Sequence, residues 1–235
     1  MLKVFQQKKT SVIPFAYQYL LSVPPSYEFE KTDKHWPLLL FLHGAGESHA
    51  PIEKVLKHGP PKLVNAYSSN KQDNPSVDNI NMECAQLVAE NFITCSPQVD
   101  RGYGWDSKVL SVLLDELEQT YCIDKNKIYV TGISMGGYGT WSLAIAQPTR
   151  FAAIIPICGG GDRQCISLLK HLPIWNFHGK LDDVIPVEES LLLIKALNSP
   201  LCKSTVYPNL KHDSWTETYN NPEIYKWLLE QTKNT

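Results

Sequence analysis

Short apolar runs alternate with longer amphipathic segments along most of the chain, and this alternation restricts the fold more than any other feature. Residues 38–42 form an uninterrupted apolar run, as expected for a strand buried on both faces of a sheet. Residues 108–120 instead carry apolar side chains at helical spacing. This order predicts an α/β protein with a mostly parallel central sheet flanked by helices. Further strands are expected at residues 17–23, 92–95, 128–130, 152–157, 174–177 and 204–207, and further helices at 136–147, 187–197 and 223–231.

The domain organisation follows from the length and from the lack of any linker or internal repeat. The 235 residues leave room for one or two domains. We expect a single domain over residues 1–235, without a large cap domain, because the candidate site residues described below are spread over most of the chain. One stretch, residues 65–81, is rich in Asn, Ser, Asp and Lys and contains Pro75. We expect a surface loop there, with a small lid over the site as the alternative.

Charge and cysteine usage limit the partners and the compartment. The 22 basic and 24 acidic residues give a net charge of -2 without a basic stripe, so a nucleic-acid partner is not expected. No apolar run approaches the roughly 20 residues of a membrane span. The six cysteines show no CxxC or Cys/His metal spacing, so no metal site is predicted. Reduced thiols and a cytoplasmic location are expected, with a bacterial periplasm as the alternative.

A Gly-x-Ser-x-Gly motif lies between a predicted strand and a predicted helix. Residues 132–136 read Gly-Ile-Ser-Met-Gly, with Ser134 at the centre. In a nucleophile elbow the serine occupies a strained turn that exposes its hydroxyl, and the glycines allow the strand and the helix to approach closely. The alternative is a phosphate-binding helix start. The nucleophile is favoured because residues 128–149 contain neither lysine nor arginine.

A catalytic serine needs a histidine base, and the base needs an acid. In this fold class the acid and then the histidine follow the serine along the chain. His212 fits because it lies in a polar stretch after the strand predicted at 204–207. His178 closes a strand and is expected to be structural. The residues alone leave three candidates for the acid, which are Asp162, Asp182 and Asp183.

The segment after the apolar run at 38–42 is the candidate oxyanion hole. Residues 43–47 read His-Gly-Ala-Gly-Glu, and small residues let backbone N–H groups face a developing oxyanion. The N–H of Met135, after the nucleophile, is the second donor. His43 is expected to be a structural hydrogen-bonding residue. Gly44 and Trp105 are expected to bind substrate, and Tyr103 and Trp215 are weighed as aromatic neighbours of the site.

These motifs together resemble the α/β-hydrolase superfamily, and more narrowly its phospholipase/carboxylesterase-like esterases. Polyhydroxybutyrate-depolymerase-like, feruloyl-esterase-like and predicted-peptidase sequences are also similar. The resemblance implies that Asp182 is the acid, that His212 is the base, and that Ala45 and Met135 supply the oxyanion donors. The sequence departs from the family pattern at Lys211, where glycine is common. The motifs that carry the resemblance are Leu-Phe-Leu-His-Gly-Ala-Gly-Glu at 40–47, Lys-His-Gly-Pro-Pro-Lys-Leu at 57–63, Ser-Pro-Gln at 96–98 with Trp105, Gly-Ile-Ser-Met-Gly-Gly-Tyr-Gly at 132–139, Phe-His-Gly-Lys-Leu-Asp-Asp-Val-Ile-Pro at 177–186, and His-Asp-Ser-Trp at 212–215.

The expected activity is hydrolysis of carboxylic esters through an acyl-enzyme intermediate. Such chemistry requires no metal and no organic cofactor. The expected partner is a small-molecule ester, and the sequence does not indicate an oligomeric state. A serine peptidase or an acyl-thioesterase is the alternative. A non-enzymatic hydrolase-like binding protein is disfavoured because all three positions of the triad are filled.

Overall fold

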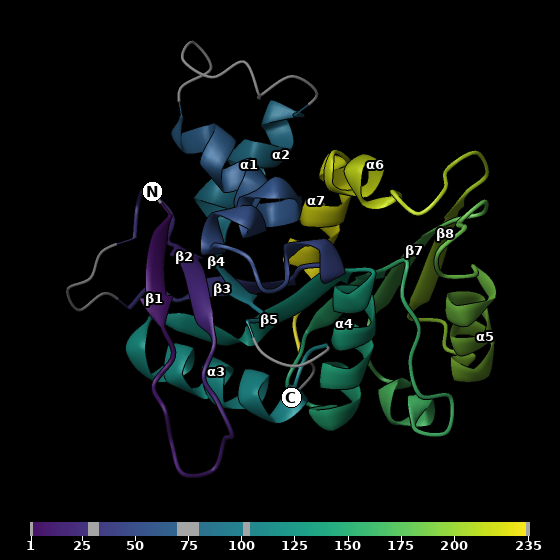
Figure 1. The fold of residues 1–235 in the computed structure, drawn as a ribbon, viewed down its shortest axis with the longest axis horizontal. Helices are drawn as coiled ribbons and strands as arrows, with labels where there is room; N and C mark the ends of the chain where they lie inside the picture. Colours follow the sequence, from purple (N-terminus) through teal and green to yellow (C-terminus); the bar gives the residue numbers. More distant parts are fainter. Residues whose placement is uncertain (1, 28–32, 70–79, 101–103, 234–235) are drawn as a thin grey trace.

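A twisted sheet of eight strands forms the centre of the molecule (Figure 1). The computed structural model describes residues 2–27, 33–69, 80–100 and 104–233. The strand order is β1-β2-β4-β3-β5-β6-β7-β8. The strand β2 is antiparallel to both of its neighbours, β1 and β4, and the six strands from β4 to β8 pair in parallel. The predicted α/β fold with a mostly parallel sheet is confirmed. The strands are β1 (Lys3–Gln6), β2 (Gln18–Ser22), β3 (Trp36–Leu42), β4 (Ile93–Gln98), β5 (Ile123–Ile133), β6 (Ala153–Ile157), β7 (Ile174–Gly179) and β8 (Cys202–Tyr207).

Helices cover both faces of the sheet, which explains the continuous apolar run in β3. Leu38 and Leu40 point into the core on one face, and Leu39 and Phe41 point into the core on the other. Figure 1 shows α3 and α4 on one side of the sheet and α1, α2 and α7 on the other. The helices are α1 (Gly59–Ser68), α2 (Met82–Asn91), α3 (Ser107–Thr120), α4 (Met135–Ala146), α5 (Glu188–Leu197), α6 (Trp215–Tyr219) and α7 (Pro222–Glu230), with short 3-10 helices η1 (Ala45–Glu47), η2 (Ile52–Lys57) and η4 (Ile166–Leu169).

The register places the carboxyl ends of the parallel strands at the same level. Leu42, at the end of β3, lies opposite Gly132 in β5, and Gly179, at the end of β7, lies opposite Tyr207 in β8. The segments that follow these strands therefore meet at one edge of the sheet, where ligand sites of parallel α/β folds form. Every candidate for the triad and the oxyanion hole lies within five residues after the carboxyl end of a parallel strand.

Among the helices and strands described, β1, α1, α2, α6 and the 3-10 helices were not predicted, and one prediction is partly wrong. The strand β1 is short and its side chains are largely exposed, so it lacks a burial pattern. The helix α1 begins with two prolines, and α2 begins after Asn81, whose side chain accepts the Glu83 N–H. The loop predicted at 65–81 is wrong for its first four residues, because α1 continues to Ser68. Residues 70–79 lie outside the described residues.

Two further features bear on the compartment. All six cysteines belong to the described part of the chain, and they are free thiols, three of them buried. None of the helices in the described ranges combines the length and the apolar character that crossing a membrane requires.

Candidate active site

Ser134 occupies a strained turn between β5 and α4. Its backbone has φ 54° and ψ −115°, a positive-φ conformation that costs a non-glycine residue on the order of 1–3 kcal/mol. Its N–H donates to the carbonyl of Ile157 over 3.0 Å, which anchors the turn to β6. A Cβ atom on Gly136 would lie 1.9 Å from the carbonyl oxygen of Leu42, and one on Gly132 would lie 2.3 Å from the carbonyl oxygen of Gly136. Both glycines of the motif are therefore required by close backbone contact.

The structure brings Ser134, His212 and Asp182 into one hydrogen-bonded row. The distance from His212 Nε2 to Ser134 Oγ is 3.0 Å, and that from His212 Nδ1 to Asp182 Oδ2 is 2.8 Å. The carboxylate must accept, so Nδ1 carries the proton and Nε2 accepts the serine hydroxyl. The other oxygen, Oδ1, accepts the N–H groups of Val184 and Ile185 at 2.9 Å each. Burial opposes the charged form of Asp182, but hydrogen bonds from His212 and these two amides outweigh it and lower the pKa.

The other two candidate acids lie apart from His212. Asp162 is exposed, and its carboxylate accepts the backbone N–H of Gln164 over 2.8 Å. Asp183 is exposed and pairs with the ammonium group of Lys211 over 2.8 Å. The lysine that departs from the family pattern thus points at Asp183, while Asp182 faces the base.

The loops that carry the acid and the base are tied together by their backbones. A Cβ atom on Gly179 would lie 2.1 Å from the carbonyl oxygen of Lys211, so the base loop requires a glycine at the end of β7. The N–H of Leu181 donates to the carbonyl of Leu210 over 2.9 Å. These contacts fix the distance between the two loops without any side chain.

The side chain of His43 links the candidate oxyanion loop, residues 43–47, to the segment after β4. The Val99 N–H donates to His43 Nε2 over 3.0 Å, so the imidazole proton is on Nδ1, which donates to the Gly44 carbonyl over 2.6 Å. Burial lowers the pKa of His43 to about 4, against the effect of the Gly44 bond, and keeps the ring neutral. The Gly44 carbonyl and the Ala45 N–H belong to one planar peptide unit. Fixing the carbonyl therefore also fixes the direction of the predicted oxyanion donor.

The two predicted donors both begin a helix. Ala45 is the first residue of η1 and Met135 is the first residue of α4. N–H groups in the first turn of a helix have no acceptor within it, so both amides are available to a ligand. The hydroxyl of Ser48 lies 4.0 Å from the sulfur of Met135 and links the two segments.

A second group of polar side chains connects the base to the oxyanion loop. The indole N–H of Trp215 donates to His58 Nδ1 over 3.2 Å, and the Trp215 ring contacts the His212 ring edge to face, with centroids 5.3 Å apart. His58 Nε2 lies 3.6 Å from a carboxylate oxygen of Glu47, which is buried in η1. Burial raises the pKa of Glu47, and burial and the nearby Lys57 lower the pKa of His58 to about 4.

A cavity of about 460 Å³ opens beside the serine. Its lining includes Trp105, Ser134, Tyr138 and Ile185, so Trp105, which is expected to bind substrate, lies at this cavity. Gly44 is not among the residues that line this cavity. Tyr103 lies outside the described residues, and Trp215 packs against two histidines instead of forming a free aromatic wall.

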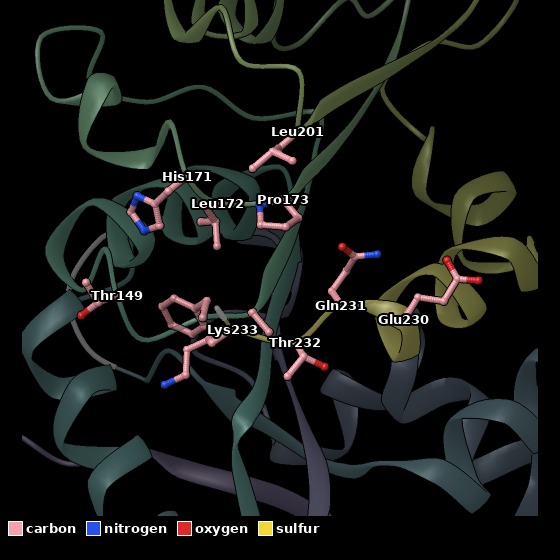
Figure 2. Close-up of a pocket in the computed structure, with 11 residues that line it drawn as sticks. Thr149, His171, Leu172, Pro173, Leu201, Glu230, Gln231, Thr232 and Lys233 are labelled. Carbon is pink, nitrogen blue, oxygen red and sulfur yellow. The ribbon is translucent and has the colours of Figure 1, made fainter. Parts of the chain in front are cut away.

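A second cavity, of about 450 Å³, lies at the opposite edge of the sheet (Figure 2). Its lining residues precede β6, β7 and β8 or lie at and after the end of α7, and they include His171, Glu230 and Lys233. The hydrogen-bond partner of His171 in this cavity is the carbonyl oxygen of Pro148, which lies 2.8 Å from its Nε2. This cavity therefore lacks the nucleophile and its partners.

The acid and the base have two further buried neighbours. His178 Nε2 lies 3.1 Å from Asp182 Oδ2, a contact that the structural interpretation of this histidine missed. The spacing of four residues between the two side chains is the signal that could have found it. The thiol of Cys158 lies within 4.8 Å of the ligand atoms of Asp182 and His212. Burial raises the pKa of this thiol to about 12, which disfavours the thiolate that a metal ion would bind.

Comparison with known families identifies the family of this chain. Residues 29–223 match the family described as phospholipase/carboxylesterase. The chain belongs to this family. The resemblance noted from the motifs is thereby confirmed. A thermostable esterase of known structure is 31% identical, with a TM-score of 0.80 over 98% of this chain and 63% of that one. The fluorophosphonate-binding serine hydrolase FphF of Staphylococcus aureus has the same fold, with 15% identity and a TM-score of 0.69 over 98% of this chain and 99% of that one.

Curated relatives include proteins named as acetylxylan and feruloyl esterases. A bifunctional acetylxylan esterase/xylanase of Neocallimastix patriciarum is 25% identical over 198 residues, which cover 78% of this chain and 28% of that protein. A probable feruloyl esterase C of Aspergillus terreus is 24% identical over 171 residues, which cover 73% of this chain and 57% of that protein. The chain thus spans less than two thirds of the length of these relatives.

Proposed function

We propose that the protein is a serine carboxylesterase that cleaves small or accessible esters through an acyl-enzyme. The observation that carries the proposal is the row of two hydrogen bonds from Ser134 through His212 to Asp182, at 3.0 and 2.8 Å. Nucleophile, base and acid at hydrogen-bond distance form the constellation of acyl-transfer catalysis. Membership of the phospholipase/carboxylesterase family supports the same reaction class.

Acylation starts at the serine hydroxyl. As Ser134 Oγ attacks the carbonyl carbon of the ester, His212 Nε2 takes the hydroxyl proton, and the Asp182 carboxylate stabilises the resulting imidazolium. The N–H groups of Ala45 and Met135 stabilise the negative oxygen of the tetrahedral intermediate. One such donor contributes about 2.7–4 kcal/mol to transition-state stabilisation. The imidazolium then donates its proton to the departing alkoxide, which leaves as an alcohol.

Deacylation repeats these roles with water as the nucleophile. His212 takes a proton from the water as its oxygen attacks the acyl carbon, and it then returns that proton to Ser134 Oγ. The products are a carboxylic acid and the free serine. None of these steps requires a metal ion or an organic cofactor.

The cavity beside Ser134 supports a small or accessible ester. Trp105 and Tyr138 give it two aromatic side chains, which suit an aryl, acyl or sugar group. The described residues between β6 and β7 form only the short helix η4, so no cap covers the site from this connection. The free thiols support a reducing compartment such as the cytoplasm.

The decisive experiment replaces the nucleophile. Ser134→Ala is expected to abolish hydrolysis of short p-nitrophenyl esters and covalent labelling by a fluorophosphonate probe. Ser167→Ala, at an exposed serine in η4, is the matched control and should retain both. Fluorophosphonate labelling at another residue of the Ser134→Ala variant would refute the proposal.

A substrate panel separates the esterase from its alternatives. Aryl esters, acetyl esters, an acyl-thioester and an aminoacyl amide should be compared by kcat/KM. The proposal expects the oxygen esters to be preferred, whereas a preference for the amide or the thioester would favour a peptidase or a thioesterase.

A further inference from the structure

We propose that His178 is a positioning residue for the catalytic acid. Its Nε2–H, which faces the Ile185 carbonyl, is shared with the same carboxylate oxygen of Asp182 that accepts the Nδ1–H of His212. It thereby fixes the orientation and the basicity of that oxygen. This inference rests on the proposed triad. It assigns His178 a part in catalysis beyond the packing of a buried strand end.

The surroundings of the ring determine where its proton lies. His178 is fully buried near the end of β7. Its Nε2 lies 3.1 Å from Asp182 Oδ2 and 3.0 Å from the carbonyl oxygen of Ile185. Both neighbours can only accept a hydrogen bond, so Nε2 must carry a proton. On the other side of the ring, Nδ1 lies 2.9 Å from the hydroxyl oxygen of Ser190, which is also fully buried.

This contact completes the set of donors around the acid. Two backbone amides donate to Oδ1 of Asp182, and the imidazole of His212 donates to Oδ2. His178 Nε2 lies 3.1 Å from the same Oδ2 and 3.0 Å from its hydrogen-bond partner, the Ile185 carbonyl. With the shared N–H of His178, four N–H groups face the carboxylate, so Oδ2 faces the base in one orientation. The His178 bond also withdraws negative charge from Oδ2. It therefore weakens the pull of the carboxylate on the proton of His212 and moderates the basicity of the catalytic imidazole.

Few other titratable groups face the Asp182 carboxylate from the packed elements. Cys158 approaches from the end of β6, and Tyr138 interacts with the carboxylate from α4. Asp183 and Lys211, on the adjacent loops, pair with each other. A change at His178 therefore acts on the acid mainly through one direct contact.

Two variants separate a donor from a packing group. His178→Phe keeps a ring of similar size but removes the N–H. We expect kcat to fall about tenfold, because the carboxylate is no longer held, while KM stays unchanged. We expect the acid limb of the kcat/KM profile to move up by roughly one pH unit, because Oδ2 then holds the His212 proton more tightly. His178→Gln places an amide N–H near the position of Nε2, and it should restore the wild-type limb and most of kcat.

The partner of the ring gives an independent check. Ser190→Ala removes the group that contacts Nδ1, and it should have no further effect on the acid limb in the His178→Phe background. His171→Phe, at an exposed histidine far from the acid, is the matched control and should leave both kcat and the limb unchanged. Thermal unfolding of each variant shows that the comparison is made on folded protein.

Nitrogen NMR of the labelled histidines tests the contact without any turnover. The proposal expects His178 to be protonated at Nε2 at neutral pH in the wild type and in Ser134→Ala. A ring protonated only at Nδ1 overturns it, as does a His178→Phe variant whose acid limb stays in place or moves down. If Ser134→Ala keeps its esterase activity, the proposed triad fails instead, whatever the state of His178.

Discussion

Lowering the pH should destabilise this protein because the buried histidine His43 resists protonation in the native state. His43 is 1% exposed, and burial lowers its pKa from 6.5 to about 4. In the unfolded chain the ring takes up a proton below about pH 6.5, whereas in the native state it stays neutral down to about pH 4. The unfolded state therefore binds more protons in this window, so stability falls as the pH falls. The stabilisation is complete above 6.5 and is lost progressively toward 4.

The size of this effect follows from the shift. The pKa falls by the difference between 6.5 and about 4, and each unit corresponds to about 1.36 kcal/mol. Between pH 7 and pH 4 the wild type should therefore lose about 3 kcal/mol more unfolding free energy than His43→Gln, which has no ionisable group at this position. Carboxylates and the other histidines are common to both proteins, so their contributions cancel in the difference.

Urea unfolding followed by tryptophan fluorescence at pH 7, 6, 5 and 4 measures the difference. His171→Gln, at an exposed histidine, is the matched control, and its pH dependence should run parallel to that of the wild type. If the gap between wild type and His43→Gln is the same at all four pH values, the reasoning is refuted. The native ring would then titrate like that of the unfolded chain, and it could not hold the oxyanion loop as a neutral donor.

Substitutions at three further positions test the site. Gly136→Ala should not yield a folded protein, because its Cβ would lie 1.9 Å from the Leu42 carbonyl; a cooperative melt at the wild-type temperature would contradict this. Trp215→Phe keeps a ring near the base but removes the N–H donated to His58, so kcat should fall about fivefold at constant KM. Trp215→Ala also removes the ring, so its kcat should be lower still. Equal kcat values for the three proteins would count against the link. Lys211→Gln should change kcat/KM by less than about twofold, because its ion pair is exposed; a larger loss would place this lysine in catalysis.

Sequence patterns predicted most of the strands and the tight turn at Ser134 because both are local features. The apolar run in β3 and the glycines around Ser134 report burial and close backbone contact within a few residues. The acid was harder to predict. Three aspartates follow the serine at similar loop positions, and only the resemblance to a family favoured Asp182. The structure separates them by distance, since the other two carboxylates are exposed and contact different partners.

The contacts around the triad could not be read from any local pattern. Trp215 and His58 are 157 positions apart, and Glu47 reaches His58 from a third segment. Their meeting depends on how three loops fold over one edge of the sheet. The strand β1 and the start of α1 were missed for a different reason. An exposed edge strand has no burial pattern, and prolines at the start of a helix resemble those of a turn.

The position of β8 at the end of the strand order affects how activity can be lost. Among the described strands it pairs with β7 alone, none of its six residues is fully buried, and the segment after it carries His212. Edge elements with few buried contacts open at a lower free energy than the core. Such an opening would carry the base away from Ser134 while the central strands stay paired. On warming, the enzyme should therefore lose turnover reversibly, and β8 amides should exchange with solvent, before the helices and the central strands unfold.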